Sequence, residues 1–152
     1  MRCMSRPQPQ DRAAYAHISA ISTRWMDNDI YGHVNNVTYY SYFDTAVNRY
    51  LIEAGVLDIH EGPVIGLVIE THCNYFAPLA FPRRVDAGIR VAHIGKSSVR
   101  YEIGLFDEDQ PLSAAGGHFV HVYVDRVTRR PVALPDDFVA ALNRLVCAPD
   151  AA

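Results

Sequence analysis

A polar stretch from Arg24 to Asn36 gathers the side chains of this sequence that are best suited to chemistry. It precedes a segment with helical periodicity, and the first N–H groups of a helix carry partial positive charge that stabilises an anion or a developing oxyanion. Asp29 would place a carboxylate beside those N–H groups, as a nucleophile or as the base for a water molecule. A carboxylate next to an oxyanion pocket is the minimum for hydrolysing an activated acyl group.

The same residues also have a purely structural interpretation. Asp27, Asn28 and Asp29 are typical of residues that tie a loop, and Asn36 is typical of a helix cap. The residue types alone leave both interpretations open.

The elements around this loop follow from the periodicity of the apolar residues. β-Branched and aromatic residues predict a strand from about 16 to 25. Helical spacing then predicts one long helix of about 18 residues that ends at Gly55. We expect this helix to begin near Asn35 or Asn36, since either residue can cap its exposed N–H groups.

The rest of the chain is typical of a sheet closed by a short helix. Turn residues divide it into predicted strands near 63–76, 84–94, 98–107 and 112–125. Short connections make successive strands antiparallel neighbours. A short helix is predicted from Asp136 to Leu145, with Asp136 as its cap. This order predicts an α+β fold, in which an antiparallel sheet of about five strands wraps over the long helix.

Length and composition predict a single domain. The 152 residues are 49% hydrophobic and 20% charged, which suits one core without a disulfide or metal staple. We place this domain at 15–147 and expect 1–14 and 148–152, which lack periodicity, to be disordered. The net charge of −3, with no block of like charge, gives no support to nucleic-acid binding.

Membrane insertion and export are not expected. The longest apolar run, 64–69, is far shorter than the roughly 18 residues of a membrane span. The first ten residues offer Pro and Gln where a secretory signal needs its apolar segment. The three cysteines are odd in number and widely spaced, which predicts reduced thiols in a cytoplasmic protein.

The polar loop and its flanks resemble a known family. They are similar to the opening motif of the hotdog-fold acyl-CoA thioesterases, the 4-hydroxybenzoyl-CoA thioesterase-like group, at Arg24, Trp25, Asp27, Asp29, Gly32, His33-Val34-Asn35-Asn36, Tyr39 and Tyr42-Phe43-Asp44. The resemblance extends from about Ile18 to Leu134 and also includes Asn74-Tyr75-Phe76. It implies a hotdog fold that hydrolyses acyl-CoA to a carboxylic acid and coenzyme A, without metal or organic cofactor.

The resemblance also implies roles for individual residues. Asp29 matches the catalytic carboxylate, and Asn36 matches the residue whose backbone N–H polarises the thioester carbonyl. Gly32 would let the loop backbone approach that carbonyl closely. His33 matches one version of the motif, with loop bracing as its alternative role, and Asp44 in the helix is the fallback catalytic acid.

The coenzyme A end of the substrate has its own candidates. The turn Gly95-Lys96-Ser97-Ser98 offers a cation, two hydroxyls and backbone N–H groups that suit phosphates, and the family often uses it so. Arginines before one strand and after another are further candidates, namely Arg83, Arg84, Arg126, Arg129 and Arg130. A nucleotide P-loop is excluded because Arg90 stands where that motif needs glycine.

Other chemistry finds less support in the sequence. His118 and His121 lie three apart in a predicted strand, so they face opposite sides and cannot share a metal. A hydratase or dehydratase on the same fold stays open because of His33, and a non-catalytic acyl-CoA-binding module is the other alternative. An exposed edge strand predicts a homodimer, or a tetramer built from two dimers.

Overall fold

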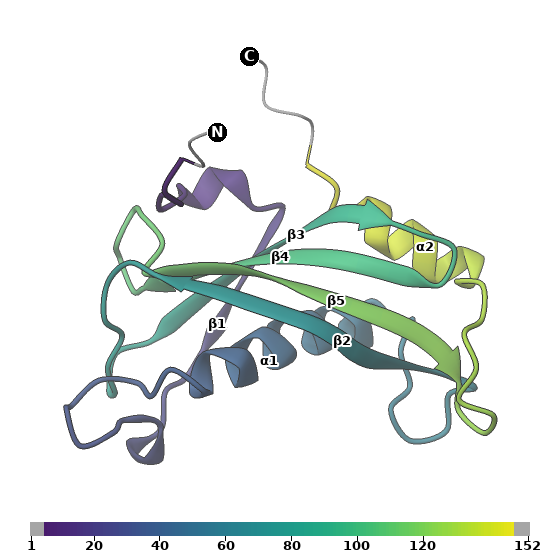
Figure 1. Cartoon of the computed structure of the whole chain (residues 1–152), viewed down its shortest axis with the longest axis horizontal. Helices are drawn as coiled ribbons and strands as arrows, with labels where there is room; N and C mark the ends of the chain where they lie inside the picture. Colours follow the sequence, from purple (N-terminus) through teal and green to yellow (C-terminus); the bar gives the residue numbers. More distant parts are fainter. Residues whose placement is uncertain (1–4, 148–152) are drawn as a thin grey trace.

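A computed structural model, described for residues 5–147, shows one antiparallel sheet arched over a long helix (Figure 1). The strands lie in the order β1-β3-β4-β5-β2, so β1 and β2 form the two edges. In chain order the elements are β1 (His17–Ile21), α1 (Thr38–Glu53), β2 (Val64–Tyr75), β3 (Val85–Ile94), β4 (Ser98–Asp107), β5 (Ala115–Asp125) and α2 (Asp136–Asn143), with 3-10 turns at Arg12–Ala14 and Trp25–Asp27. The α+β hotdog architecture predicted from the sequence is confirmed.

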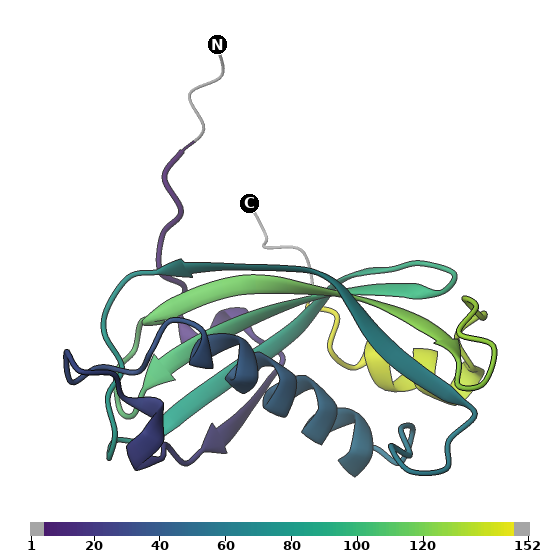
Figure 2. The same cartoon turned by 60° about the horizontal axis from the view of Figure 1, so that its bottom comes forward.

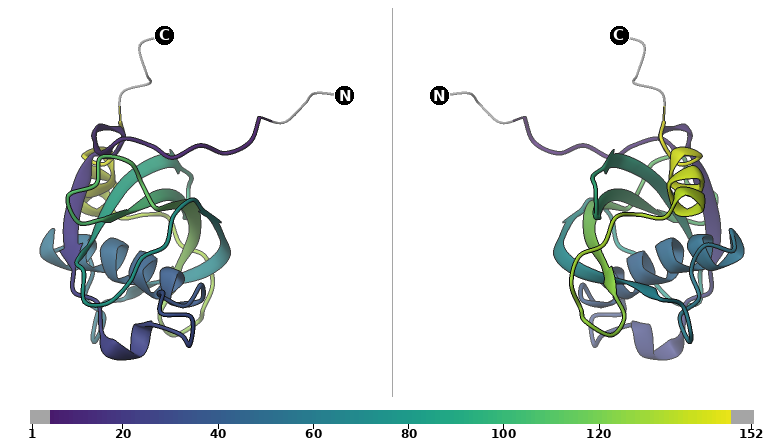
Figure 3. Two further views of the ribbon diagram at one scale, coloured as in Figure 1. Left: turned by 90° about the vertical axis from the view of Figure 1, so that its left-hand side faces the viewer. Right: turned by 90° about the vertical axis from the view of Figure 1, so that its right-hand side faces the viewer.

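The sheet curves around α1, as the views from below and along its end show (Figures 2 and 3). Its inner face carries the core: Phe43 of α1 meets Phe119 of β5 edge to face at 6.0 Å, and both are buried. The short helix α2 covers the far end of the same face, where Phe138 packs on Tyr123 with ring centroids 4.6 Å apart. The N-terminal segment lies against the outer face of the sheet, where Arg12 and Tyr15 pack on Phe106.

The long helix begins two residues later than predicted. Its first residue is Thr38, and its N-cap is Val37, which makes no side-chain cap hydrogen bond. Neither Asn35 nor Asn36 caps it: the Asn35 side chain accepts from the N–H of Val37 at 3.1 Å, and its carbonyl accepts from Thr38. These bonds close a separate turn ahead of the helix. The predicted end is right, because Gly55 adopts a φ of 74° just beyond the last turn.

Two further expectations need correction. The short helix begins at Asp136, but its N-cap is Pro135 and Asp136 makes no capping bond; it ends at Asn143, two residues early. The first strand is limited to His17–Ile21 rather than 16–25.

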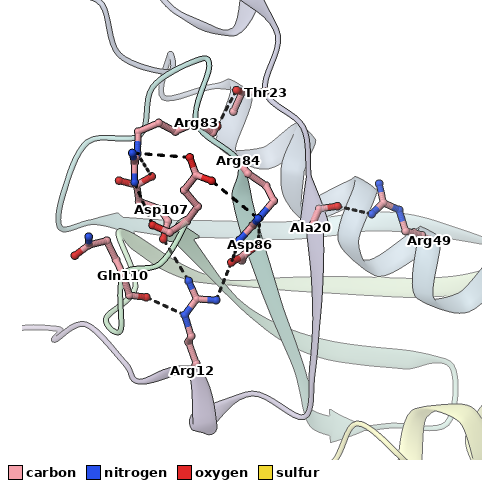
Figure 4. A network of polar contacts seen from close by, with 10 residues as sticks. Arg12, Ala20, Thr23, Arg49, Arg83, Arg84, Asp86, Asp107 and Gln110 are labelled. Atoms are coloured by element: carbon pink, nitrogen blue, oxygen red, sulfur yellow. Dashed lines mark hydrogen bonds and ion pairs between the residues drawn. The ribbon is translucent and has the colours of Figure 1, made fainter.

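Within residues 5–14, the described part of the segment expected to be disordered, Arg12 holds the chain to the sheet by charge (Figure 4). Arg12 pairs with Asp86 of β3 at 2.8 Å and donates to the carbonyl of Gln110 at 2.8 Å. Arg84 pairs with the other oxygen of Asp86, also at 2.8 Å. Two guanidinium groups hold the pKa of the buried Asp86 below its usual value, although burial alone raises it. Residues 1–4 and 148–152 lie outside the described part of the chain.

Candidate active site

The loop ahead of α1 is anchored by a buried carboxylate, Asp27, which is only 1% exposed. Tyr42 of α1 donates to it at 2.7 Å, and Arg24 donates from its backbone and its guanidinium at 2.9 Å. Burial by itself raises the pKa of Asp27, but these hydrogen bonds and the Arg24 charge together hold it below its usual range. Its carbonyl accepts from the N–H of Asn35 at 2.8 Å, which fixes the segment leading into α1.

Asp29 sits at the next bend of the loop, on a turn that Gly32 closes. The N–H of Asp29 donates to the carbonyl of His33 at 2.9 Å, and the N–H of Gly32 donates back to the carbonyl of Asp29 at 3.0 Å. Gly32 has a φ of 81°, a conformation that other residues adopt at a cost, so its predicted backbone role fits the turn. One oxygen of the Asp29 side chain accepts from the N–H of Tyr31 at 2.9 Å. The second oxygen makes no hydrogen bond to any of the described residues.

Asn36 lies directly before the first turn of α1, with its peptide held on both sides. Its carbonyl accepts from the hydroxyl of Tyr75 on β2 at 3.0 Å, and the adjacent Asn35 is fixed by Asp27. Among residues 5–147, no acceptor contacts the backbone N–H of Asn36. A rigid and unpaired N–H beside a helix start is what an oxyanion site requires.

His33 in the loop and Asp44 in α1 are the other two candidate catalytic side chains. The His33 side chain is exposed and makes no hydrogen bond within the described chain, so the bracing of the loop falls to its backbone carbonyl. Asp44 lies on α1, two turns below the helix start, and partial burial raises the pKa of its carboxyl. Both residues stay available to a substrate.

The loop is also rich in exposed apolar side chains, which a single chain leaves uncovered. They are Trp25, Met26, Ile30, Tyr31 and Val37. Exposed apolar patches of this kind mark surfaces that a partner or a ligand covers.

The sequence analysis assigned no role to the residues that support the loop. Tyr42, Arg24 and Tyr75 position the loop, yet Tyr42 and Tyr75 come from a helix and an edge strand far along the chain. The resemblance had marked all three, but only the fold brings them to Asp27 and Asn36.

The turn Gly95 to Ser98 lies at the opposite end of the sheet from Asn36. Ser98 pairs with Val122 near the end of β5, whereas Tyr75, beside Asn36, pairs with Ala115 at the start of β5. Lys96 is exposed, and Ser97 and Ser98 are half-buried. At about 3.3 Å per residue, the ten-residue strand β4 separates the two ends by roughly 30 Å.

Arg83 lies at the same end as Asn36 and is already paired. Its guanidinium contacts Asp107 at 2.7 Å and Glu108 at 3.8 Å, and the carboxylate of Asp107 raises its pKa. A phosphate would therefore have to compete with two carboxylates for Arg83. Lys96 has no such carboxylate partner among the described residues.

The histidines on β5 divide as predicted between the faces of the sheet. His121 is buried on the inner face, and desolvation lowers its pKa to about 4; His118 lies on the outer face. Within residues 5–147, no three His, Cys, Asp or Glu side chains are arranged to hold a metal ion. None of the helices in that range has the length and apolar character needed to cross a membrane.

Comparison with known proteins links this geometry to one family. Residues 23–142 match the thioesterase-like superfamily. The crystal structure of the PA5185 protein from Pseudomonas aeruginosa shares 57% identity and superposes with a TM-score of 0.92, over 94% of this chain and 100% of that one. PA2801, a putative thioesterase from the same species, shares 29% identity with a TM-score of 0.78, over 84% of this chain and 98% of that one.

A curated relative carries the similarity inside a longer protein. The L-carnitine dehydrogenase/betainyl-CoA thioesterase of Agrobacterium fabrum is 25% identical over 130 residues, which cover 85% of this chain. The chain spans only 26% of the length of that relative.

Proposed function

The chain belongs to the thioesterase-like superfamily, and from this premise we propose that it hydrolyses an acyl-CoA thioester to a carboxylic acid and free coenzyme A. The observation that carries the proposal is the unpaired backbone N–H of Asn36, held rigidly beside the turn that presents Asp29. The N–H receives the negative charge that develops on the thioester carbonyl oxygen. The second Asp29 oxygen, which the loop leaves unpaired, serves the attack on the carbonyl carbon.

Two routes are open to Asp29, and each balances. In the first, its carboxylate attacks the carbonyl carbon, the C–S bond breaks to release coenzyme A thiolate, and water hydrolyses the resulting mixed anhydride. In the second, it takes a proton from water, the hydroxide adds to the carbonyl carbon, and the C–S bond breaks as that proton passes to the thiolate. Rapid quenching followed by mass spectrometry of the protein separates these routes. An acyl adduct on Asp29 indicates nucleophilic attack, and an unmodified enzyme during turnover indicates base catalysis.

A second copy of the chain would complete the site. β2 is an exposed edge strand of twelve residues, and Leu67, Val68 and Ile69 in its middle are all exposed. Such an edge invites pairing with another strand. Antiparallel pairing of two β2 edges about a two-fold axis brings the helix start of one protomer to the same end as the 95–98 turn of its partner.

In this dimer, coenzyme A would extend from Asn36 of one protomer toward Lys96, Ser97 and Ser98 of the other, with Arg83 at the same end. We propose a homodimer, or a tetramer of two such dimers, working in the cytoplasm with no metal or organic cofactor. The separation of helix start and turn by most of the length of β4 within one chain supports a shared site.

Assay of thiol release over a panel of acyl-CoA chain lengths tests the activity, with Asp29→Asn as the matched inactive variant. Steady release well above that variant supports a thioesterase. Loss of enoyl absorbance without thiol release would instead indicate a hydratase, and binding without turnover would indicate a binding module.

Mixing two variants tests the shared site. A heterodimer of an Asp29→Asn chain and a Lys96→Ala chain contains one site with both residues intact and one with neither. At a substrate concentration well below KM, where the weaker binding of Lys96→Ala limits its rate, we expect activity in the mixture that exceeds the sum of the two parents. If both residues served a site within one chain, no intact site would form on mixing.

A further inference from the structure

A cavity on the outer face of the sheet lies across the sheet from α1 and from the proposed thioester site. It has a volume of about 180 Å³ and is covered by the N-terminal residues Pro7, Gln8 and Gln10. A typical site for a drug-sized ligand holds roughly 300–1,000 Å³, so this cavity suits a small ligand. Its walls are mainly polar: Arg100 and Glu102 of β4, His118 of β5, and His72 and Asn74 of β2.

Tyr15 contributes to this cavity a hydroxyl that no described residue pairs. The residue is only 8% exposed, because its ring lies flat over Gly88 and Gly104, where any Cβ would come within 2.7 Å of it. The hydroxyl reaches toward Gly116 in the cavity floor and makes no hydrogen bond to any of the described residues. This hydroxyl is free to donate a hydrogen bond to a ligand in the cavity.

Arg100 contributes a guanidinium that the described chain does not pair. The other arginine of the cavity, Arg90, is fully engaged: it contacts Glu102 at 3.0 Å, donates to the carbonyl of Ala14 and lies over the ring of Tyr15. Arg90 and Glu102 cancel each other's charge. The residues that line the cavity therefore carry one positive charge in excess, and Arg100 also lowers the pKa of Glu70, which lies outside the cavity.

The two histidines add no free Nε2 to the cavity. Their rings stack at 5.3 Å, and each Nε2 is occupied, by Asn74 for His72 and by Glu70 for His118. Glu70 is the one further carboxylate near the rim: it lies outside the cavity, its side chain is largely exposed, and it is bound to His118.

We propose that this cavity binds a small oxyanion, a carboxylate or a phosphate, with Arg100 as its charged ligand and the Tyr15 hydroxyl as a second donor. A guanidinium presents several N–H groups in a plane that matches the oxygens of either anion. Neither residue takes part in the thioester chemistry proposed above, because the sheet separates them from α1. The cavity is thus a second site with its own ligand.

Thermal unfolding and calorimetric titration with sodium phosphate or sodium acetate, against sodium chloride at equal ionic strength, test the proposal. We expect saturable binding of at least one oxyanion, and the anion that binds identifies the ligand class. Arg100→Gln should weaken it about tenfold or more, as loss of a charge-assisted hydrogen bond implies. Arg144→Gln, which removes a charge from α2, should leave it unchanged.

Tyr15→Phe separates binding from folding. It removes only the unpaired hydroxyl, so the melting temperature in chloride should stay the same while oxyanion binding weakens several-fold. Equal binding by the wild type and Arg100→Gln would overturn the proposal, as would the absence of saturable binding of either anion in the millimolar range. Both results are independent of thioesterase activity.

Discussion

The loop ahead of α1 and the turn between β3 and β4 are both proposed to contact the substrate, but they are built in different ways. The loop is anchored by a buried carboxylate: Asp27 accepts bonds from Tyr42 and Arg24, and its carbonyl accepts from Asn35. The turn is held by its backbone alone, through the carbonyls of Lys96 and Ser97. The Lys96 side chain extends into solvent.

The difference matches the two tasks. An oxyanion site must hold its N–H in place before the reaction, because reorganisation during the chemical step costs rate. A phosphate needs only nearby positive charge, which an exposed lysine supplies and salt screens. Changes in the loop should therefore lower kcat, and changes in the turn should raise KM.

Replacing the proposed catalytic carboxylate gives the largest expected effect. Asp29→Asn keeps the side-chain oxygen that accepts from Tyr31, so the turn should persist while the negative charge is lost. We expect kcat to fall at least about a hundredfold, or roughly 2.7 kcal/mol of barrier, with KM nearly unchanged. Steady-state kinetics measure this, and near-wild-type kcat would transfer the catalytic role to Asp44 or His33.

The sequence predicts the fold well because long-range packing here agrees with local patterning. Each strand of the sheet and the stop of α1 at Gly55 are visible in the apolar periodicity. The start of α1 is not visible in this way. Asn35 and Asn36 both have side chains that could cap the helix, but hydrogen bonds of these residues to Asp27 and Tyr75 make Val37 the N-cap. The ion pair of Arg12 is not visible in the sequence either, since its partner Asp86 is 74 residues away.

Prediction of the site from the sequence is limited in the same way by contacts between distant residues. The residues with chemistry, Asp29 and Asn36, lie within eight positions of each other and stand out in the sequence. The residues that hold them in place do not stand out. The apolar pattern of the sequence already explains Tyr42 and Tyr75 as packing residues, so their hydrogen bonds to Asp27 and Asn36 cannot be foreseen. The pairing of Arg83 with Asp107 was equally invisible, since it depends on the register of β3 against β4.

The second prediction concerns the anchor of the loop. Asp27→Asn replaces a buried carboxylate that accepts from Tyr42 and Arg24. Loss of charge-assisted hydrogen bonds should lower the free energy of unfolding by about 2 kcal/mol near neutral pH. Denaturant unfolding measures this, with Asp109→Asn on an exposed turn as the control that should change little.

The pH dependence of that difference identifies its cause. Because the pKa of Asp27 is lowered in the folded state, its contribution is complete above the ordinary value of 3.8 and disappears as the pH falls through the folded value. The stability gap between the wild type and Asp27→Asn should therefore narrow below about pH 4. A gap that stays constant on acidification would show that packing, not charge, is what the variant loses.

A smaller effect is expected where β2 meets the helix start. Tyr75→Phe removes the bond to the carbonyl of Asn36 but keeps the ring packed against Tyr39 at 4.8 Å. We expect kcat to fall about fivefold, which corresponds to about 1 kcal/mol for one hydrogen bond, with an unchanged KM. An unchanged melting temperature alongside the lower kcat would distinguish positioning of the peptide from general destabilisation. A melting temperature that falls together with kcat would contradict a positioning role for Tyr75.

The smallest effect is expected at the turn, where it concerns binding alone. Lys96→Ala should raise KM for coenzyme A thioesters by up to about fivefold, since exposed charge pairs contribute about 0.2–1 kcal/mol. Arg83→Ala should have less effect, because Asp107 and Glu108 already neutralise that side chain.

A short thioester without the nucleotide should be hydrolysed equally by the wild type and Lys96→Ala. The wild-type KM for coenzyme A substrates should also rise with ionic strength, whereas that of the short thioester should not. Equal damage to both substrates would mean that Lys96 supports the β3–β4 turn itself, and the contrast between a rigid loop and a merely charged turn would then fail.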